Sequence, residues 1–351
     1  MNFSTLLENW KHTGIQPDDL SLQSCIAKIK DKINSHPEMM LDVLFADALM
    51  QTAQSDHHIY LRQYEIPQIV LFDLLIHKLP FVALAHEIIN TQALHDSVAF
   101  SEIVWIDVGI GRGIQTEKWL AKMAKDHPRL KKLTIIGIEP FRDALETATE
   151  KINTLAASLP FTVQYYPIEA FIENLKAEDI QSLFPENYDV VMLNSTLTLH
   201  HIAQQEQRQQ FFNLAKSLGV LYIYLTEPNS DHYHEDLLIR IQNAYRHFGA
   251  VFQVIDQLSI SQRDKNGLKL FFGREIQDIA RTDTHERFEK HEPYDRWLHY
   301  LKQSGYQTQK IHLSSQSTLV NLQENIAAEG FVSGISHQDV NVLSLISAIL
   351  S

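Results

Sequence analysis

The segment Ile-Val-Trp-Ile-Asp-Val-Gly-Ile-Gly-Arg-Gly-Ile-Gln, residues 103–115, decides the fold of this chain. Its apolar first half is typical of a buried parallel strand, and glycine then occupies every second position, at Gly109, Gly111 and Gly113. Residues without a Cβ atom let the backbone turn tightly and approach a ligand closely. The segment therefore predicts the strand, turn and helix of an α/β fold that binds a ligand carrying an adenosine.

The spacing of the glycines and one carboxylate indicate which ligand. The dinucleotide signature Gly-x-Gly-x-x-Gly has its third glycine one residue later than this chain does, which disfavours an NAD-dependent oxidoreductase. Asp107 stands two residues before the first glycine, where its charge would repel a pyrophosphate but suits an ammonium and a sulfonium group. The pattern Asp-x-Gly-x-Gly-x-Gly resembles the first motif of class I S-adenosylmethionine (SAM) methyltransferases.

A second carboxylate follows the next predicted strand. The apolar run at residues 133–138 ends in Glu139, whose side chain can accept hydrogen bonds from both hydroxyls of a ribose. Together with Asp107 and the three glycines, Glu139 predicts a SAM site. The alternative is a nucleotide-like strand and turn that retains no ligand.

Strands and helices alternate from residue 103 onward, which predicts a parallel sheet with helices on both faces. We expect an α/β, Rossmann-like class I methyltransferase sheet of seven mostly parallel strands with an α-helical cap. The expected strands are residues 103–108, 133–139, 161–166, 188–193, 219–226, 306–313 and 340–349, the last one antiparallel. Helical periodicity predicts four segments: an N-terminal helical cap (1–98), a SAM-binding core (99–226), a helical cap insertion (227–300) and the C-terminal part of the core (301–351).

Several polar residues follow the predicted strands, at the edge where open α/β sheets bind ligands. Glu169 matches the acidic position that approaches the adenine amino group in such enzymes, and its alternative is an exposed carboxylate at a helix start. Asn194 is expected to contact the cofactor. Glu227, Asn229 and Tyr233, at and beyond the fifth strand, are expected to contact the substrate.

The segment Leu199-His-His-Ile202 resembles the Leu-His-His-Leu segment of many small-molecule methyltransferases. A histidine just past this strand could remove a proton from the methyl acceptor, so His200 is the candidate catalytic base. The alternative is a pair of histidines that stabilises the start of the following helix.

The composition limits the class of protein. With 351 residues, 44% of them hydrophobic, the chain can bury a full core. A formal net charge of −13 disfavours direct binding to nucleic acid, whose phosphates attract Lys and Arg. The most apolar long stretch, residues 66–85, is interrupted by Asp73, His77 and Lys78, so we expect no membrane span.

Cys25 is the only cysteine, so neither an internal disulfide nor a cysteine zinc cluster is expected. The first residues lack the basic start and apolar core of a signal peptide. Both observations favour a reducing, cytoplasmic location, with the nucleus as an alternative inside a eukaryotic cell. The histidines are scattered, and His232 with His234 lacks further clear ligands nearby, so we expect no metal site.

Three later segments resemble consecutive blocks of the GRAS family. They are Tyr245-Arg-His-Phe-Gly-Ala-Val-Phe-Gln-Val-Ile-Asp-Gln-Leu, Phe272-Gly-Arg-Glu-Ile-Gln-Asp-Ile-Ala and Arg287-Phe-Glu-Lys-His-Glu-Pro-Tyr-Asp-Arg-Trp. The family's VHIID block corresponds to residues 104–108, and its first leucine-rich block to the helices around residues 41–64. The chain keeps Ser347-Ala348 without the closing tryptophan of plant members, and it keeps a complete glycine series that plant members usually lack. The resemblance is therefore to a bacterial-type GRAS protein.

GRAS proteins are best known as plant transcriptional regulators. The resemblance implies a methyltransferase-like core, a helical cap and often a dimer, so we expect a homodimer. It also identifies Arg274 and Glu275 as a matched pair that would bind substrate. Because neighbours on a helix point about 100° apart, the pair need not face one cavity, and ion pairs between cap and core are the alternative.

Together these observations predict a SAM-dependent methyltransferase. It would transfer a methyl group to an oxygen or nitrogen of a small or medium polar molecule held under the cap, mainly by positioning the reactants. The alternative is a GRAS regulatory module that binds SAM, another ligand or nothing in this site and acts through protein partners.

Overall fold

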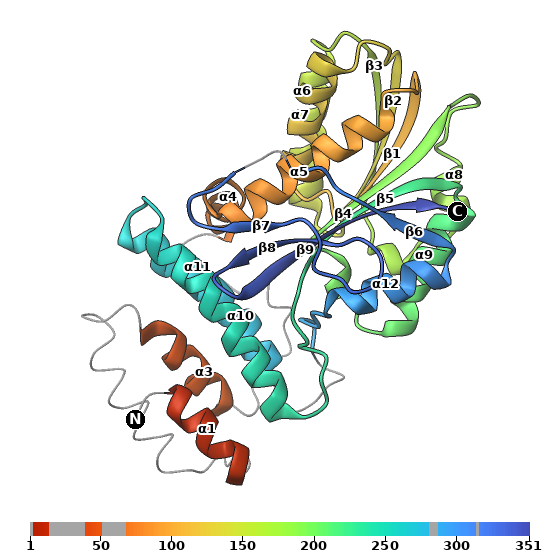
Figure 1. Ribbon diagram of the computed structural model, residues 1–351. Coiled ribbons are helices and arrows are strands. Elements are labelled where there is room, and N and C mark those ends of the chain that lie inside the picture. Colours follow the sequence, from red (N-terminus) through yellow and green to blue (C-terminus); the bar gives the residue numbers. More distant parts are fainter. Residues whose placement is uncertain (1–2, 14–38, 51–67, 281–286, 314–315) are drawn as a thin grey trace.

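A nine-stranded sheet forms the centre of the computed structural model, which describes residues 3–13, 39–50, 68–280, 287–313 and 316–351 (Figure 1). Five strands are parallel and lie in the order β3 (Thr162–Ile168), β2 (Lys132–Ile138), β1 (Glu102–Val108), β4 (Val190–Thr196) and β5 (Val220–Pro228). The order reverses between β1 and β4. The carboxyl ends of these two strands therefore lie at the switch point, where open α/β sheets bind ligands.

The sheet continues from β5 through antiparallel strands. β9 (Val340–Leu350) pairs with β5 along one edge, and its other edge is divided between β8 (Ser333–His337) and β6 (Tyr306–Gln309). β7 (Asn321–Gln323) then pairs with β8. The mostly parallel methyltransferase-like sheet and the antiparallel last strand are confirmed, but the count of seven strands was wrong.

Alternate residues of β1 face two separate cores. Ile103 and Trp105 belong to a core with α5 (Pro80–Ser97), α6 (Ile114–Asp126) and α7 (Arg142–Ala156), and Trp105 stacks on Trp119 of α6 with ring centroids 3.9 Å apart. Val104, Ile106 and Val108 face a second core with α8 (Ala177–Gln181), α9 (Gln205–Ser217) and α12 (Tyr294–Gln303). Because both faces of this strand are covered, its sequence is a continuous apolar run.

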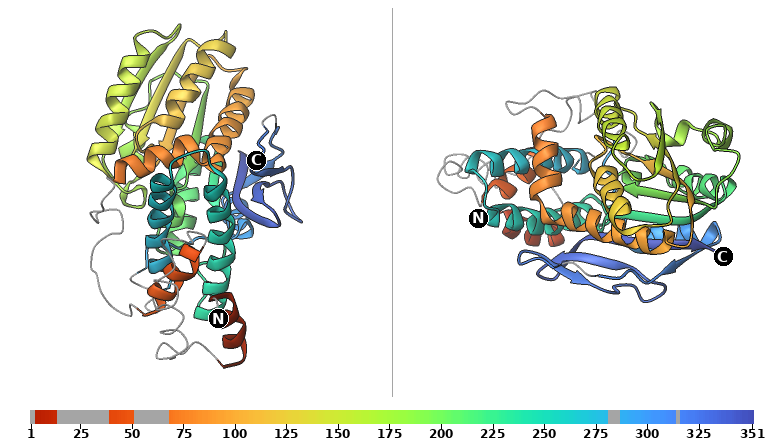
Figure 2. Two further views of the ribbon diagram at one scale, coloured as in Figure 1. Left: turned by 90° about the vertical axis from the view of Figure 1, so that its left-hand side faces the viewer. Right: turned by 90° about the horizontal axis from the view of Figure 1, so that it is seen from above.

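The helical cap extends from the first core. It comprises α1 (Phe3–Thr13), α3 (Met40–Met50), α4 (Gln68–Lys78), α10 (Leu237–Gln257) and α11 (Gln262–Ile279), and α11 packs against α3, α4 and α10. Asp236 caps α10 by accepting from the backbone N–H groups of residues 238 and 239, and Ser261 caps α11. Figures 1 and 2 show these helices gathered at one end of the sheet.

Two helices from the predicted cap segments lie on the sheet. α5 packs on α6 and β9, and α12 packs on α9 and β6. The division into four segments stays a prediction. Cys25 and residues 51–64 of the leucine-rich block lie outside the described residues. Among the helices that the structure describes, none is both long enough and apolar enough to cross a membrane.

Candidate functional site

The loop after β1 turns through three glycines in the left-handed region. Gly109, Gly111 and Gly113 have φ angles of 75°, 52° and 71°. A Cβ on Gly109 would lie 1.9 Å from Thr198 Oγ1, and one on Gly113 would lie 3.2 Å from Ala148 Cβ. Among the described residues, a Cβ on Gly111 would meet only one atom within contact range, a backbone oxygen at 4.0 Å. Packing therefore requires glycine at the first and third positions, whereas the second leaves open space beside the loop.

Glu139 lies against this loop. Its Oε2 accepts from Gly111 N at 3.0 Å, and its Oε1 accepts from Phe141 N at 3.1 Å. Burial raises the pKa of Glu139 to about 7. Each carboxylate oxygen retains a second lone pair, so Glu139 can still accept from two hydroxyl groups. The structure thus brings this predicted cofactor ligand to the glycine loop.

The Asp107 carboxylate is buried and accepts hydrogen bonds from uncharged side chains. One oxygen accepts from Asn194 Nδ2 at 2.8 Å and the other from the Thr116 hydroxyl, and burial raises its pKa. Asn194 Oδ1 in turn accepts from Gln115 Nε2 at 3.3 Å, and Gln115 contacts Asn90 of α5. The observed role of Asp107 is to tie β1 to β4 and to the start of α6, while its contact with a cofactor stays a prediction.

Glu169 follows β3 and forms an exposed ion pair with Arg142. The distance from its Oε2 to Arg142 Nε is 2.9 Å, and the two side chains are 43% and 69% exposed. This geometry fits the alternative of an exposed carboxylate, and the predicted contact with adenine stays untested.

His200 lies in the short 3₁₀ helix η4 (Leu199–His201), just beyond β4. Its Nδ1 lies 2.7 Å from Glu227 Oε2, and the other oxygen of Glu227 accepts from Leu199 N and Thr198 N. A carboxylate at Nδ1 favours the tautomer with the proton on Nδ1 and the lone pair on Nε2. Glu227, which we predicted to bind substrate, therefore orients the predicted base.

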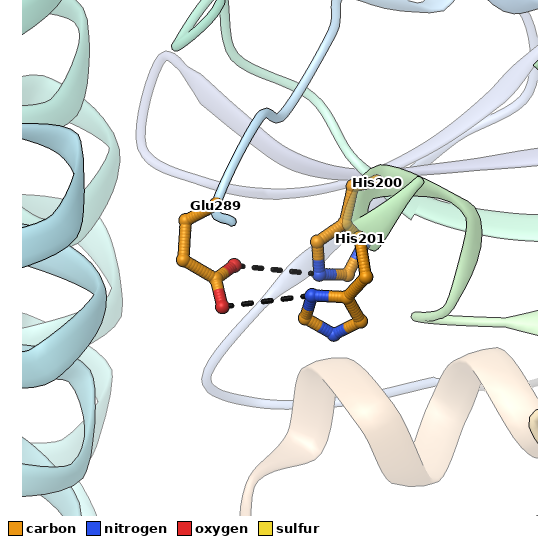
Figure 3. Close-up of side chains that lie close together, drawn as sticks. All are labelled: His200, His201 and Glu289. Atoms are coloured by element: carbon orange, nitrogen blue, oxygen red, sulfur yellow. Dashed lines mark ion pairs between the residues drawn. The ribbon is translucent and has the colours of Figure 1, made fainter. Parts of the chain in front are cut away.

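The free side of His200 faces a buried cluster around Glu289. Glu289 Oε2 lies 3.6 Å from His200 Nε2 and 3.5 Å from His291 Nε2, and its Oε1 lies 3.6 Å from His201 Nδ1. Figure 3 shows the Glu289 carboxylate pointing from its own segment toward the rings of His200 and His201. Histidines that are scattered in the sequence therefore gather at one point in space.

Two buried side chains hold the partners of this cluster in place. Arg208 of α9 donates to the carbonyl oxygens of His200 and Lys290 and pairs with Glu292 at 2.6 Å. Asp278 of α11 accepts from Glu289 N at 2.7 Å. Residues 287–297 stand out in the sequence as a family block, but no sequence pattern connects them to His200, because the contact joins segments far apart in the chain.

Comparison with known proteins decides the family. A family model, the GRAS domain family, matches residues 19–343. The chain belongs to this family. GRAS family protein RAD1 of Lotus japonicus is 22% identical over 68% of the chain and 48% of its own length, and DELLA protein RGL3 of Arabidopsis thaliana is 22% identical over 69% and 46%. The chain spans about half the length of the curated relatives it matches.

Solved structures agree on the fold of this GRAS domain. The crystal structure of SCL7 in Oryza sativa has a TM-score of 0.81 and 19% identity, and the match covers 98% of both chains. The crystal structure of DszA carbon methyltransferase has a TM-score of 0.50 and 14% identity over 93% of this chain and 69% of that one. At these identities the likeness shows the fold alone, a methyltransferase-like core with added helices.

The remaining predicted substrate residues of the GRAS domain differ in their surroundings. Asn229 accepts from Tyr294 N at 3.0 Å and borders a surface cavity of about 300 Å³, whose lining includes no residue of the glycine loop or η4. Tyr233 is half-buried, and its hydroxyl lies 3.5 Å from Ala203 O. Glu275 belongs to the group around Glu289, whereas Arg274 lies over the ring of Phe271 at 5.2 Å. Within the described part of the chain these contacts define no shared pocket, and the substrate roles stay predictions.

Proposed function

We propose that this GRAS domain binds SAM beside the glycine loop and acts as a regulatory module through protein partners. The observation that carries the binding proposal is the open position at Gly111, which lies next to the Glu139 carboxylate at the switch point of the sheet. A carboxylate there can accept from both ribose hydroxyls, while the left-handed glycines let the backbone approach the adenosine. Membership of the GRAS family supports the regulatory role.

A second candidate function is methyl transfer to an oxygen or nitrogen of a small or medium polar molecule. The observation that favours it is the buried pair of His200 and Glu227, which leaves Nε2 as the atom that can accept a proton. We place it second because Nε2 faces the Glu289 carboxylate at 3.6 Å. A base that serves an acceptor needs that acceptor within hydrogen-bond reach.

Calorimetric titration of the full chain with SAM and S-adenosylhomocysteine tests the binding proposal. We expect one ligand per chain, and no heat of binding to the folded protein would refute a SAM site. Transfer of labelled methyl groups from SAM to pools of polar acceptors then separates the two candidates. Transfer that His200→Gln abolishes would establish the enzyme, and inactivity of the saturated protein across these pools would leave the regulator.

The remaining parts of the proposal rest on the family resemblance and on composition. We propose a bacterial-type member, although the relatives named above are plant proteins, because the chain keeps all three glycines. A homodimer and a cytoplasmic or, inside a eukaryotic host, nuclear location belong to the same proposal. Sedimentation analysis of the purified chain tests the dimer.

A further inference from the structure

We propose that Glu289, His200, His201 and His291 bind one divalent transition-metal ion, of the Zn²⁺ or Fe²⁺ class, between the sheet and the cap. Imidazole and carboxylate ligands are the donors that such ions take in proteins. The inference concerns the other side of η4 from the glycine loop and does not depend on SAM binding.

The distances fit ligands around a shared ion better than direct hydrogen bonds. Glu289 lies 3.5–3.6 Å from one nitrogen of each of the three rings, beyond the usual range of N–H···O bonds. Metal bonds of about 2.1 Å in a tetrahedral arrangement separate neighbouring ligand atoms by about 3.4 Å. The ligand atoms of His200, His201 and Glu289 all lie within 4.8 Å of one another, so small side-chain shifts bring them to one ion. His291 belongs to a second such group, with Glu275 and the same Glu289, and has to move further to reach that ion.

His291 gives a second, independent indication of a ligand. Its side chain is 2% exposed, yet within the described residues neither ring nitrogen makes a hydrogen bond. A buried polar group without a partner destabilises the fold, and a metal bond at Nε2 would remove that cost for one nitrogen.

The surroundings resemble the outer shell of protein metal sites. Glu227 at Nδ1 of His200 leaves Nε2 for the ion, which is the carboxylate–histidine–metal arrangement. Glu275 lies close to Glu289 and His291, with one ligand atom of each of the three residues within 4.8 Å of the others. A divalent ion would offset the repulsion between these two carboxylates.

The site is held rigidly and remains accessible. Arg208 fixes the backbone of His200 and of Lys290, so one side chain sets the position of both ligand segments. His201 is 29% exposed and forms the solvent side of the cluster. An ion at this position would act as a Lewis acid beside the carboxyl end of β4. His200 would then be a ligand and not a base, because both roles use Nε2.

Titration of the chelator-treated full chain with Co²⁺, followed by visible absorption, tests the proposal. We expect saturation at one ion per chain, and competition by Zn²⁺. Glu289→Gln and His201→Gln should each weaken binding by more than the ~10–100-fold that loss of an outer-shell partner costs, and Glu227→Gln should weaken it within that range. His201→Gln is the safer variant, since its partly exposed side chain contributes least to the core.

His95→Gln is the matched control, because His95 is an exposed histidine outside the cluster, 66% accessible at its side chain. It should leave Co²⁺ binding unchanged. Failure to reach one equivalent, or equal binding by the wild type and by folded Glu289→Gln and His201→Gln variants, would overturn the site. Loss of binding in His95→Gln would identify surface binding instead. Titration of the metal-free chain with SAM gives a result that does not depend on Co²⁺ binding. The SAM site and the metal site can therefore fail or succeed independently.

Discussion

Gly111→Ala separates ligand binding from folding more cleanly than any other change to the glycine loop. The new Cβ would point into space where the nearest atom outside its chain neighbours is a backbone oxygen at 4.0 Å. The folded chain therefore bears mainly the cost of a left-handed alanine at φ 52°, about 1–2 kcal/mol, or a fall in melting temperature of about 1–3 °C for a chain of this length. In the SAM complex the same methyl group would occupy ligand space.

Gly219→Ala supplies the matched control for this variant. Gly219 has φ 70°, and an added Cβ there would meet no atom of the described residues within 4 Å. It precedes β5, so it lies at the amino ends of the parallel strands, away from the glycine loop. Both alanine variants should lose similar stability in thermal unfolding. In calorimetry, Gly111→Ala should weaken SAM binding by about 10- to 100-fold, the equivalent of overpacking a contact by 1–3 kcal/mol, whereas Gly219→Ala should bind as the wild type does.

SAM binding by Gly111→Ala at wild-type affinity would refute the placement of the ligand beside this loop. Gly111→Ala tests this placement more clearly than Asp107→Ala does. Removing that carboxylate would leave the buried Asn194 amide and Thr116 hydroxyl without their acceptor, a cost of about 1–3 kcal/mol each. Lost SAM binding in such a variant would not distinguish a missing ligand contact from a disturbed fold.

Three further predictions concern the core. Burial raises the pKa of Glu139 from 4.5 to about 7, so between these pH values the folded chain keeps a proton that the unfolded chain loses. The free energy of unfolding, measured by urea titration at each pH, should therefore fall by up to about 3 kcal/mol as the pH rises through this window. Glu139→Gln should flatten this pH profile. Arg208→Met should cost about 3–5 kcal/mol in urea unfolding, because it leaves the Glu292 carboxylate buried without its cationic partner; a loss below 1 kcal/mol would contradict a closed ion pair. Trp119→Ala should cost about 3–5 kcal/mol by removing the ring stacked on Trp105, and an unchanged urea midpoint would contradict the described packing of α6 on the sheet.

The sequence was informative where one local pattern determines one local structure. The apolar run of residues 103–108 and the alternating glycines predicted β1 and its turn, because a doubly covered strand needs apolar side chains on both faces and left-handed turns need glycine. Glu139 could be placed at the glycine loop for the same reason, since the ends of neighbouring parallel strands meet at one edge.

Local sequence patterns could not predict the short polar strands or the contacts between distant segments. Asn321–Gln323 and Ser333–His337 carry no apolar alternation. Ser333–His337 forms a strand because β9 offers it a free edge, and Asn321–Gln323 then pairs with that strand. Asp107 has the residue type of a cofactor ligand, but only the fold reveals that Asn194 and Thr116 donate hydrogen bonds to its carboxylate. Glu289 reaches His200 across 89 positions, which no spacing rule connects.

The segment from Thr198 to His201 joins the two proposed sites and explains why they should be tested separately. Thr198 packs on Gly109 on one side, while His200 and His201 face Glu289 on the other. Gly111→Ala adds a methyl group that contacts no atom of this segment, and His201→Gln changes a partly exposed ring on the Glu289 side. If each variant loses only its own ligand, the GRAS domain holds two independent sites. If His201→Gln also changes SAM affinity, the backbone of η4 transmits the effect, because Thr198 N and Leu199 N both donate to the Glu227 carboxylate that orients His200.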